Sequence, residues 1–103
     1  MKIFISQPMK GKTEEFIAQE REKALEQLTK LHPGAEIIDS HFKNIDWGCE
    51  INPLAKPLKY LSRSIDLLAD ADLAVFLSGW DEARGCRAEE MIAYLYGLKR
   101  LYF

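Results

Sequence analysis

The stretch that decides the fold reads Asp72-Leu-Ala-Val-Phe-Leu-Ser-Gly-Trp-Asp-Glu-Ala-Arg-Gly-Cys-Arg-Ala-Glu-Glu-Met-Ile-Ala93. Residues 73–77 form a short apolar run between an acid and Ser78-Gly79, which is typical of a strand buried on both faces. Apolar residues then recur at helical spacing, and Gly97 stands where a helix would end. The residues of this apolar stripe are Ala88, Met91, Ile92 and Leu95. We therefore predict a parallel-type strand, a polar loop over residues 78–84 and a helix that begins at Gly85.

The rest of the chain alternates strands and helices in the same way. Residues 2–6 read as a strand, and Gln7-Pro8-Met9-Lys10-Gly11 as a turn. Thr13 is a predicted N-cap of a helix that ends at Pro33-Gly34 and carries one apolar stripe. That stripe consists of Ile17, Ala24, Leu28 and Leu31. Further predicted elements are a strand at 35–39 with Ile37 and Ile38 buried, a helix at 58–69 and a strand at 99–103.

A strand-helix unit repeated three times and closed by a strand predicts a parallel sheet with right-handed crossovers. The expected architecture is α/β, a three-layer Rossmann-like or flavodoxin-like fold with strand order 2-1-3-4 and helices on both faces. The order then reverses between the first and third strands, which brings loop 7–12 beside loop 78–89. Open α/β sheets bind ligands at such a point, so we expect a pocket there.

Composition excludes several classes of function. A chain of 103 residues, 48% of them hydrophobic, is long enough for one core, and we predict a single domain over 1–103. With 14 basic and 16 acidic residues the net charge is −2, so a nucleic acid polymer is not an expected partner. No apolar stretch is long enough for a membrane span, and no signal peptide is recognised. Cys49 and Cys86 form neither a disulfide framework nor a metal-spaced pair, so we expect a cytoplasmic protein without a metal or cofactor.

Glu89 is the most informative carboxylate in the chain. It lies about one turn inside the predicted helix, where free backbone N–H groups and the helix dipole favour the charged form. An ionised carboxylate over a pocket acts as a nucleophile or an electrostatic clamp. Glu89 and Glu90 are equally explained as first-turn acids that only stabilise the helix.

Four motifs together carry a family resemblance: Met1-Lys-Ile-Phe-Ile-Ser-Gln-Pro-Met-Lys-Gly11, Ala71-Asp72-Leu-Ala-Val75, Gly79-Trp80, and Gly85-Cys-Arg-Ala-Glu89 with Ala93. In this order they resemble the nucleoside 2-deoxyribosyltransferase-like family, and within it a small phage and bacterial subgroup of largely unassigned function. The resemblance implies that Glu89 attacks the anomeric carbon of a 2′-deoxyribonucleoside or its 5′-monophosphate, and that a second base or water resolves the glycosyl-enzyme. Asp72 matches a recurrent acid of that family, but it stands at the amino end of the third predicted strand, far from the pocket, so we expect a structural role for it. The resemblance also implies a homo-oligomer.

The chain departs from that family at two functional positions. Ser64 stands where active members carry an aspartate that helps to protonate the leaving base, and a serine hydroxyl is no acid near neutral pH. Ala83 replaces a residue that holds the 5′ substituent of the sugar. Asp81 is the replacement acid that we expect. Arg84 and Arg87 either meet a phosphate or lie on a solvated face.

Residues expected at the pocket, besides Glu89 and Asp81, are Ser6, Gln7, Pro8, Met9, Gly11, His41, Ser64, Gly79, Trp80, Arg84 and Gly85. His41 and Trp47 belong to a long segment without periodicity, which is a candidate lid over the pocket. His41 either contacts the ligand or is solvated. Trp47 either stacks on a base or anchors the loop. Trp80 either stacks on a base or covers the end of its strand. Cys86 is interpreted as a packed residue rather than a nucleophile, because no histidine partner is placed by the sequence.

Three functions follow as hypotheses. The first is an N-glycosyl transferase or hydrolase that uses Glu89, and the second is a nucleotide-binding module of the same fold without turnover. The third is a small interaction protein with a vestigial pocket. Aromatic and aliphatic residues crowd the last helix and strand, which indicates self-association; they are Tyr94, Tyr96, Leu98, Leu101, Tyr102 and Phe103.

Overall fold

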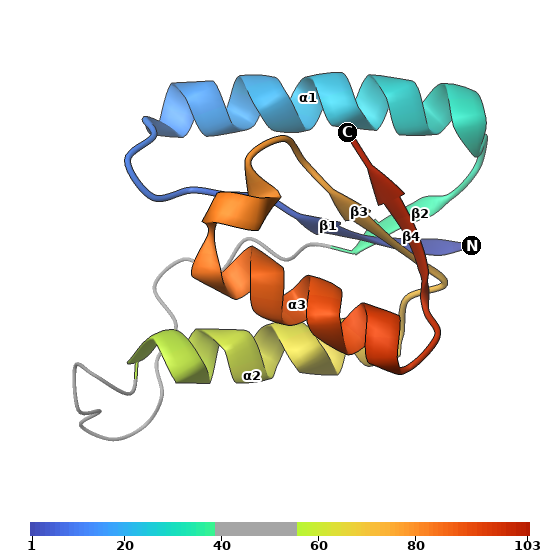
Figure 1. Ribbon diagram of the computed structural model, residues 1–103. Helices are drawn as coiled ribbons and strands as arrows, with labels where there is room; N and C mark the ends of the chain where they lie inside the picture. The colour runs from blue at the N-terminus through green and yellow to red at the C-terminus, as the bar shows by residue number, and fades with distance from the viewer. Residues whose placement is uncertain (39–55) are drawn as a thin grey trace.

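The computed structural model describes residues 1–38 and 56–103 (Figure 1). The predictions made for His41 and Trp47 lie outside these residues. In chain order the elements are β1 (Lys2–Ser6), α1 (Glu14–Leu31), β2 (Glu36–Ile38), α2 (Lys56–Ala69), β3 (Leu73–Phe76), the 3-10 turn η1 (Trp80–Glu82), α3 (Arg84–Leu95) and β4 (Lys99–Tyr102). No helix in these two ranges is long and apolar enough to cross a membrane.

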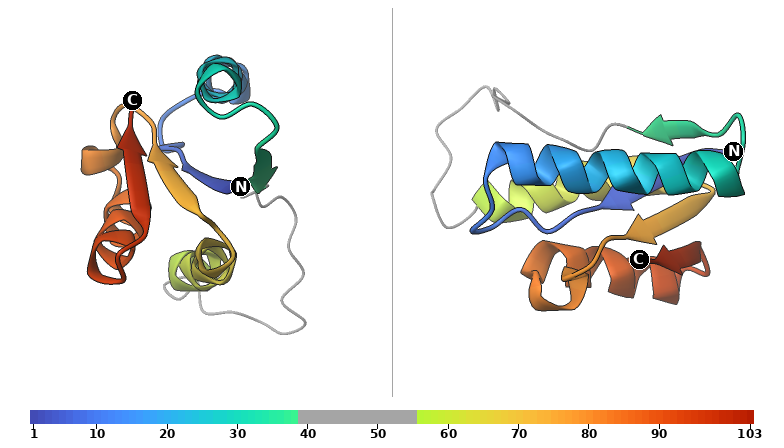
Figure 2. Two further views of the ribbon diagram at one scale, coloured as in Figure 1. Left: turned by 90° about the vertical axis from the view of Figure 1, so that its right-hand side faces the viewer. Right: turned by 90° about the horizontal axis from the view of Figure 1, so that it is seen from above.

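The four strands form one parallel sheet in the order β2-β1-β3-β4, which confirms the predicted topology. The helix α1 covers one face, and α2 and α3 cover the other, so the fold has three layers (Figures 1 and 2). The start of β1 is fixed by Asp72, whose Oδ2 accepts a hydrogen bond of 2.7 Å from the backbone N–H of Lys2. This bond gives Asp72 the structural role expected for it, at the amino end of the strands.

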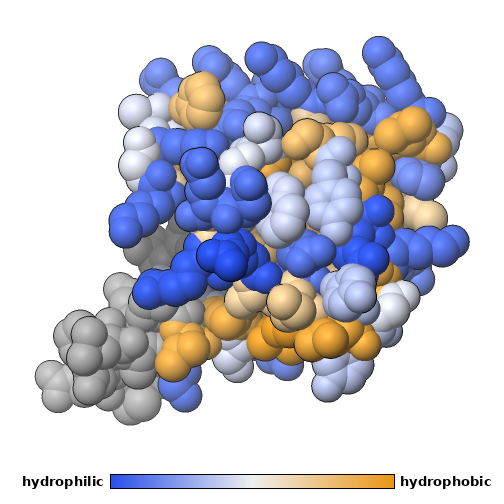
Figure 3. Space-filling view, in the orientation of Figure 1, coloured by the Kyte–Doolittle hydropathy of each residue, from blue (hydrophilic) through white to orange (hydrophobic). Residues whose placement is uncertain are grey.

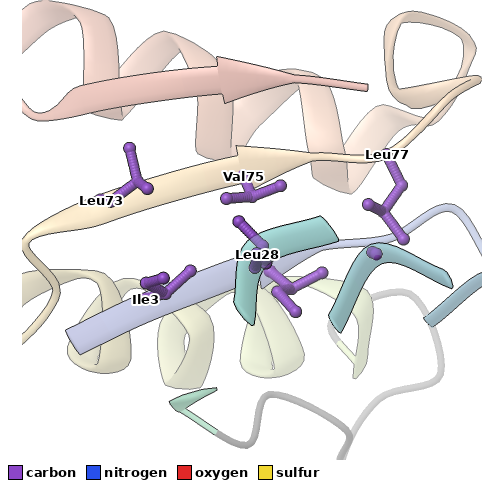
Figure 4. Close-up of a cluster of buried hydrophobic side chains, with 7 residues drawn as sticks. Ile3, Leu28, Leu73, Val75 and Leu77 are labelled. Atoms are coloured by element: carbon purple, nitrogen blue, oxygen red, sulfur yellow. The ribbon is translucent and has the colours of Figure 1, made fainter. Parts of the chain in front are cut away.

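The core under α1 is built from alternate residues of the two central strands. Ile3 and Ile5 of β1 and Val75 of β3 are at most 1% exposed, and they face Leu28 of α1. Figure 4 shows Leu28 among the strand side chains that surround it. Burial of an aliphatic side chain of this size stabilises a fold by about 1.5–3 kcal/mol.

Intervening residues of the same strands point to the opposite face. Phe4 and Phe76 are fully buried there and pack with Leu68 of α2 and Ala93 of α3. The last residue of β1, Ser6, belongs to this face by alternation with Phe4, because successive strand residues point to opposite sides. A polar side chain therefore enters the layer between the sheet and the pair α2 and α3.

Two expectations for the first half of the chain need correction. The strand β2 is described over Glu36–Ile38, and Ile37 and Ile38 are half-buried rather than buried, because β2 is an edge strand paired only with β1. On α1, Ala24 and Leu28 are buried, but Leu31 is 58% exposed because the helix ends there. The predicted N-cap is confirmed, since Thr13 Oγ1 accepts a hydrogen bond of 3.1 Å from the N–H of Phe16.

The apolar stripe predicted for α3 does not face the sheet. The buried residues of α3 are Cys86, Glu89 and Ala93, whereas Met91 and Leu95 are 53% and 65% exposed. The helix begins at Arg84, one residue before the predicted Gly85. The sheet-facing side of α3 carries a carboxyl and a thiol, and the stripe of larger apolar residues lies away from the sheet. The apolar spacing therefore predicted the wrong side of α3 as the one that faces the sheet.

The apolar residues of α2 and α3 leave a hollow of about 620 Å³ between the two helices, lined by Ile65, Leu68, Ala69, Ala71, Ile92, Ala93, Tyr96, Gly97 and Leu98. Figure 3 shows exposed hydrophobic residues over this part of the molecule. Of the terminal residues expected at an oligomer surface, Tyr94 and Tyr96 are exposed, but Leu101 and Phe103 pack against the core. Self-association therefore stays a prediction, with Tyr94, Tyr96 and Tyr102 as the exposed part of its expected surface.

Candidate functional site

The loops after β1 and β3 lie side by side at the carboxyl end of the sheet, as the topology predicts. Ser6 pairs with Phe76 in the parallel register, and the N–H of Leu77 donates to the Ser6 carbonyl at 3.0 Å. Gly79 has a positive φ of 90°, and a Cβ built on it would lie 3.6 Å from Pro8 Cγ. Pro8 is buried, so these two predicted pocket residues form the packed contact between the loops.

Glu89 is the centre of the site. Its side chain is 8% exposed, and its Oε1 accepts a hydrogen bond of 2.9 Å from the hydroxyl of Ser6. The hydroxyl of Ser64, on α2, acts on the same carboxyl group and favours its charged form. Three elements that are remote in sequence, β1, α2 and α3, thus converge on one carboxyl group.

Burial raises the pKa of Glu89 from its ordinary value of 4.5 to about 7, although the hydrogen bonds from Ser6 and Ser64 act in the opposite direction. This corrects the expectation that the helix start keeps Glu89 charged. The helix begins at Arg84, so Glu89 is its sixth residue and lies beyond the first four N–H groups that lack an intrahelical partner. Removal of the carboxyl from water therefore outweighs the dipole. A carboxyl with a pKa near neutrality exchanges its proton readily at physiological pH.

Cys86 lies one turn before Glu89 on the same face of α3. Its thiol is buried and hydrogen-bonds to the hydroxyl of Ser6, and Glu89 and Lys12 act on it electrostatically. Burial is the main reason that the pKa of Cys86 rises to about 11. The thiol is therefore protonated at neutral pH, which agrees with its interpretation as a packed residue.

Gln7 ties the loop after β1 to α1. It is 8% exposed, and its Nε2 donates a hydrogen bond of 2.7 Å to the Ile17 carbonyl. The loop turns where the N–H of Lys12 donates to the Met9 carbonyl at 3.2 Å, with Gly11 at a positive φ of 78°. Met9 is half-buried and Gly11 is exposed, so this turn forms a rim rather than the floor of the site.

A second group of the predicted residues lies elsewhere, around a surface hollow of about 590 Å³ lined by Trp80, Asp81, Glu82, Arg84, Arg87, Ala88, Glu90 and Met91. Arg84, Ala88 and Met91 lie on one side of α3 at a rotation of 100° per residue, and Glu89 lies on the other. Figure 3 shows strongly hydrophilic side chains over this start of α3. The hollow and the buried carboxyl are thus on opposite sides of the same helix.

Trp80 belongs to the packing of the sheet. Its ring centroid is 5.6 Å from that of Phe76 and 5.4 Å from that of Tyr102. These separations are typical of aromatic contacts that stabilise a core. The structure therefore favours the interpretation in which Trp80 covers the end of β3.

One protein family matches almost the whole chain. Residues 1–102 match the family described as Domain of unknown function (DUF4406). The chain belongs to this family. Neither a curated protein nor a solved structure gives a significant match.

In this DUF4406 chain, the structure brings together only part of the predicted site. Ser6 donates a hydrogen bond to Glu89 and Ser64 acts on the same carboxyl group, while Pro8 and Gly79 approach each other in the loops after β1 and β3. Asp81 and Arg84 are exposed in the hollow on the other side of α3, and Gly85 is exposed in the first turn. His41 lies outside the described residues.

The sequence did not place Cys86 in the site beside Ser6 and Glu89. Helical spacing could have done so, because Cys86 and Glu89 are three residues apart in a predicted helix and therefore share a face. Within residues 1–38 and 56–103, no group of three His, Cys, Asp or Glu side chains is arranged to hold a metal ion.

Proposed function

We propose that this DUF4406 chain acts on the N-glycosidic bond of a 2′-deoxyribonucleoside or its 5′-monophosphate, with Glu89 as the nucleophile. The single observation that carries the proposal is a buried glutamate, hydrogen-bonded to Ser6, at the carboxyl end of the central strands. Ligands of open α/β folds bind at that end of the sheet. The resemblance of the four sequence motifs to nucleoside 2-deoxyribosyltransferases supplies the reaction.

The proposed chemistry has two steps. An oxygen of Glu89 bonds to the anomeric carbon while the bond from that carbon to the base nitrogen breaks, and the base leaves with the electron pair. The base takes a proton from water, because Ser64 is not acidic enough to supply one near neutral pH. In the second step, water or another base bonds to the anomeric carbon as the bond from that carbon to Glu89 breaks, and Glu89 returns as a carboxylate. The attacking group gives up a proton, which neutralises the hydroxide formed in the first step.

The state of Glu89 gives this reaction a characteristic pH dependence. Only the carboxylate attacks, and its pKa of about 7 leaves the side chain mostly protonated at pH 6. We expect kcat/KM to rise about tenfold between pH 6 and pH 8, following the ionised fraction of a single group in the free protein.

A second function is favoured by the position of Asp81. The acid expected to assist Glu89 lies in the hollow on the other side of α3. A site without a general acid is consistent with a module that holds a nucleotide and does not cleave it. Such a module would use Glu89 and its serines as hydrogen-bonding groups for the ligand.

The two functions separate in one incubation of the purified protein with deoxyribonucleosides and their 5′-monophosphates, with and without an acceptor base, followed by chromatography. Turnover that is lost in Glu89→Gln and kept in the neighbouring Glu90→Gln supports the enzyme. Glu90 is the matched control because it accepts a hydrogen bond of 2.8 Å from Tyr102 on the exposed side. Absence of turnover together with thermal stabilisation by one of these ligands supports the binding module. Absence of both turnover and stabilisation contradicts both functions.

A further inference from the structure

Two serine hydroxyls from different elements border the Glu89 carboxyl group. Ser6 is the last residue of β1 and is 2% exposed, and its hydroxyl lies 2.9 Å from Glu89 Oε1. Ser64 is half-buried on α2, and its hydroxyl favours the charged form of the same carboxyl. Ser6 is 83 residues away from Glu89 in the chain, so the fold as a whole creates this contact.

The hydrogen of the Ser6 hydroxyl has a defined direction. A serine hydroxyl has one hydrogen to donate and two lone pairs that accept. In the structure this hydrogen is donated to Glu89 Oε1, at 2.9 Å.

We propose that Ser6 and Ser64 are positioning residues that together fix the orientation of the Glu89 carboxylate and keep it charged for attack. The inference rests on the proposed function, since it assigns these serines a part in the same reaction. A carboxylate has about four lone-pair directions, and the Ser6 hydroxyl occupies one of them. That hydrogen bond restricts rotation of the carboxyl group, and within the described residues the other oxygen is left for a reacting carbon.

The groups that act on Glu89 within the described residues come from each element packed against it. They are Ser6 of β1, Ser64 of α2 and Cys86 of α3, with Lys12 of the loop after β1 acting on Cys86. Burial disfavours the charged carboxyl, and each hydroxyl favours it. Removal of either hydroxyl should therefore raise the pKa of Glu89 by about one unit, because a hydrogen bond to a charged group contributes roughly that much.

The first test measures Glu89 directly and needs no substrate. Carbon-13 NMR follows the Glu89 side-chain carboxyl through a pH titration, with the signal assigned by its loss in Glu89→Gln. We expect the midpoint to move upward by about one pH unit in Ser6→Ala and in Ser64→Ala. It should stay in place in Ser64→Thr, which keeps the hydroxyl, and in Ser62→Ala, an exposed serine of the same helix. Unchanged midpoints in both hydroxyl-free variants would overturn the proposal.

The second test compares pH profiles of kcat/KM in the same set of proteins, because this ratio reports the ionisation of the free protein that the NMR titration follows. If the serines act through Glu89, the profile moves by the same amount as the NMR midpoint, and turnover at pH 7 falls about fivefold as the ionised fraction drops. KM should change little, and Ser64→Thr should restore the profile. An NMR midpoint that moves while the kinetic profile does not would refute the positioning role and leave the proposed function intact. If the wild-type protein shows no turnover, the proposed function fails, and the titration still decides whether the serines hold Glu89 charged.

Discussion

Replacement of Glu89 by Gln is expected to stabilise the protein at alkaline pH. Glutamine has nearly the same shape and its amide oxygen still accepts the hydrogen bond from Ser6, but it carries no charge into the buried site. The pKa of Glu89 rises from 4.5 to about 7 on folding. Well below pH 4.5, Glu89 is protonated in both the folded and the unfolded state, so its ionisation does not change the free energy of unfolding. Between 4.5 and 7 the folded state holds a proton that the unfolded state has released, so the free energy of unfolding falls as the pH rises.

Each pKa unit corresponds to about 1.4 kcal/mol, so the full loss is about 3 kcal/mol, most of it between pH 5 and pH 8. Urea unfolding of the wild-type and Glu89→Gln proteins at both pH values measures this difference. The difference in urea midpoint between the variant and the wild type should be about 1–2 M larger at pH 8 than at pH 5, because the free energy of unfolding changes by roughly 1–3 kcal/mol per M of urea. A difference between the two proteins that is the same at pH 5 and pH 8 would refute the claim that burial controls this carboxyl.

Two further substitutions test the fold around the site. Leu28→Ala should lower the free energy of unfolding by about 2–5 kcal/mol because Leu28 is 1% exposed. Leu31→Ala on the same helix should lower it by well under about 1 kcal/mol. Similar losses for the two variants in denaturant titrations would contradict the assigned core. Gly79→Ala should destabilise by about 1 kcal/mol because Gly79 has a φ of 90°, while Gly85→Ala should be neutral or stabilising in the first turn of α3. Equal thermal midpoints for these two glycine variants would argue against the positive φ.

The sheet could be predicted from the sequence because alternation of strands and helices leaves few allowed topologies. The same reasoning correctly placed the loops after β1 and β3 together. It failed for the orientation of α3, since the larger apolar residues were assumed to face the sheet. In the structure, the sheet-facing positions hold Cys86, Glu89 and Ala93. Periodicity identifies an apolar stripe but does not say whether that stripe faces the sheet, another helix or open surface.

For the candidate site, the family resemblance selected Glu89, but the sequence did not predict the environment of this side chain. Ser64 appears in the sequence only as a serine in a helix, and its contact with Glu89 depends on how α2 and α3 pack together. Asp81 is near Glu89 in the chain, yet η1 and the start of α3 place it on the other side of the helix. Proximity in sequence was thus a poor guide here, because a helix turns neighbouring residues to opposite sides.

The long separation between paired segments also determines the order in which the chain can fold during synthesis. Ile3 pairs with Leu73. At 5–20 residues added per second, about 4–14 s pass between the synthesis of β1 and that of its partner β3. The helix α1 emerges first and can cover Ile3 and Ile5 with Leu28. The side of β1 that carries Phe4 has no such early cover, since its contacts come from β3, α2 and α3. A nascent chain halted before α3 would therefore expose the site side of the sheet, and that is the surface on which a chaperone would be needed.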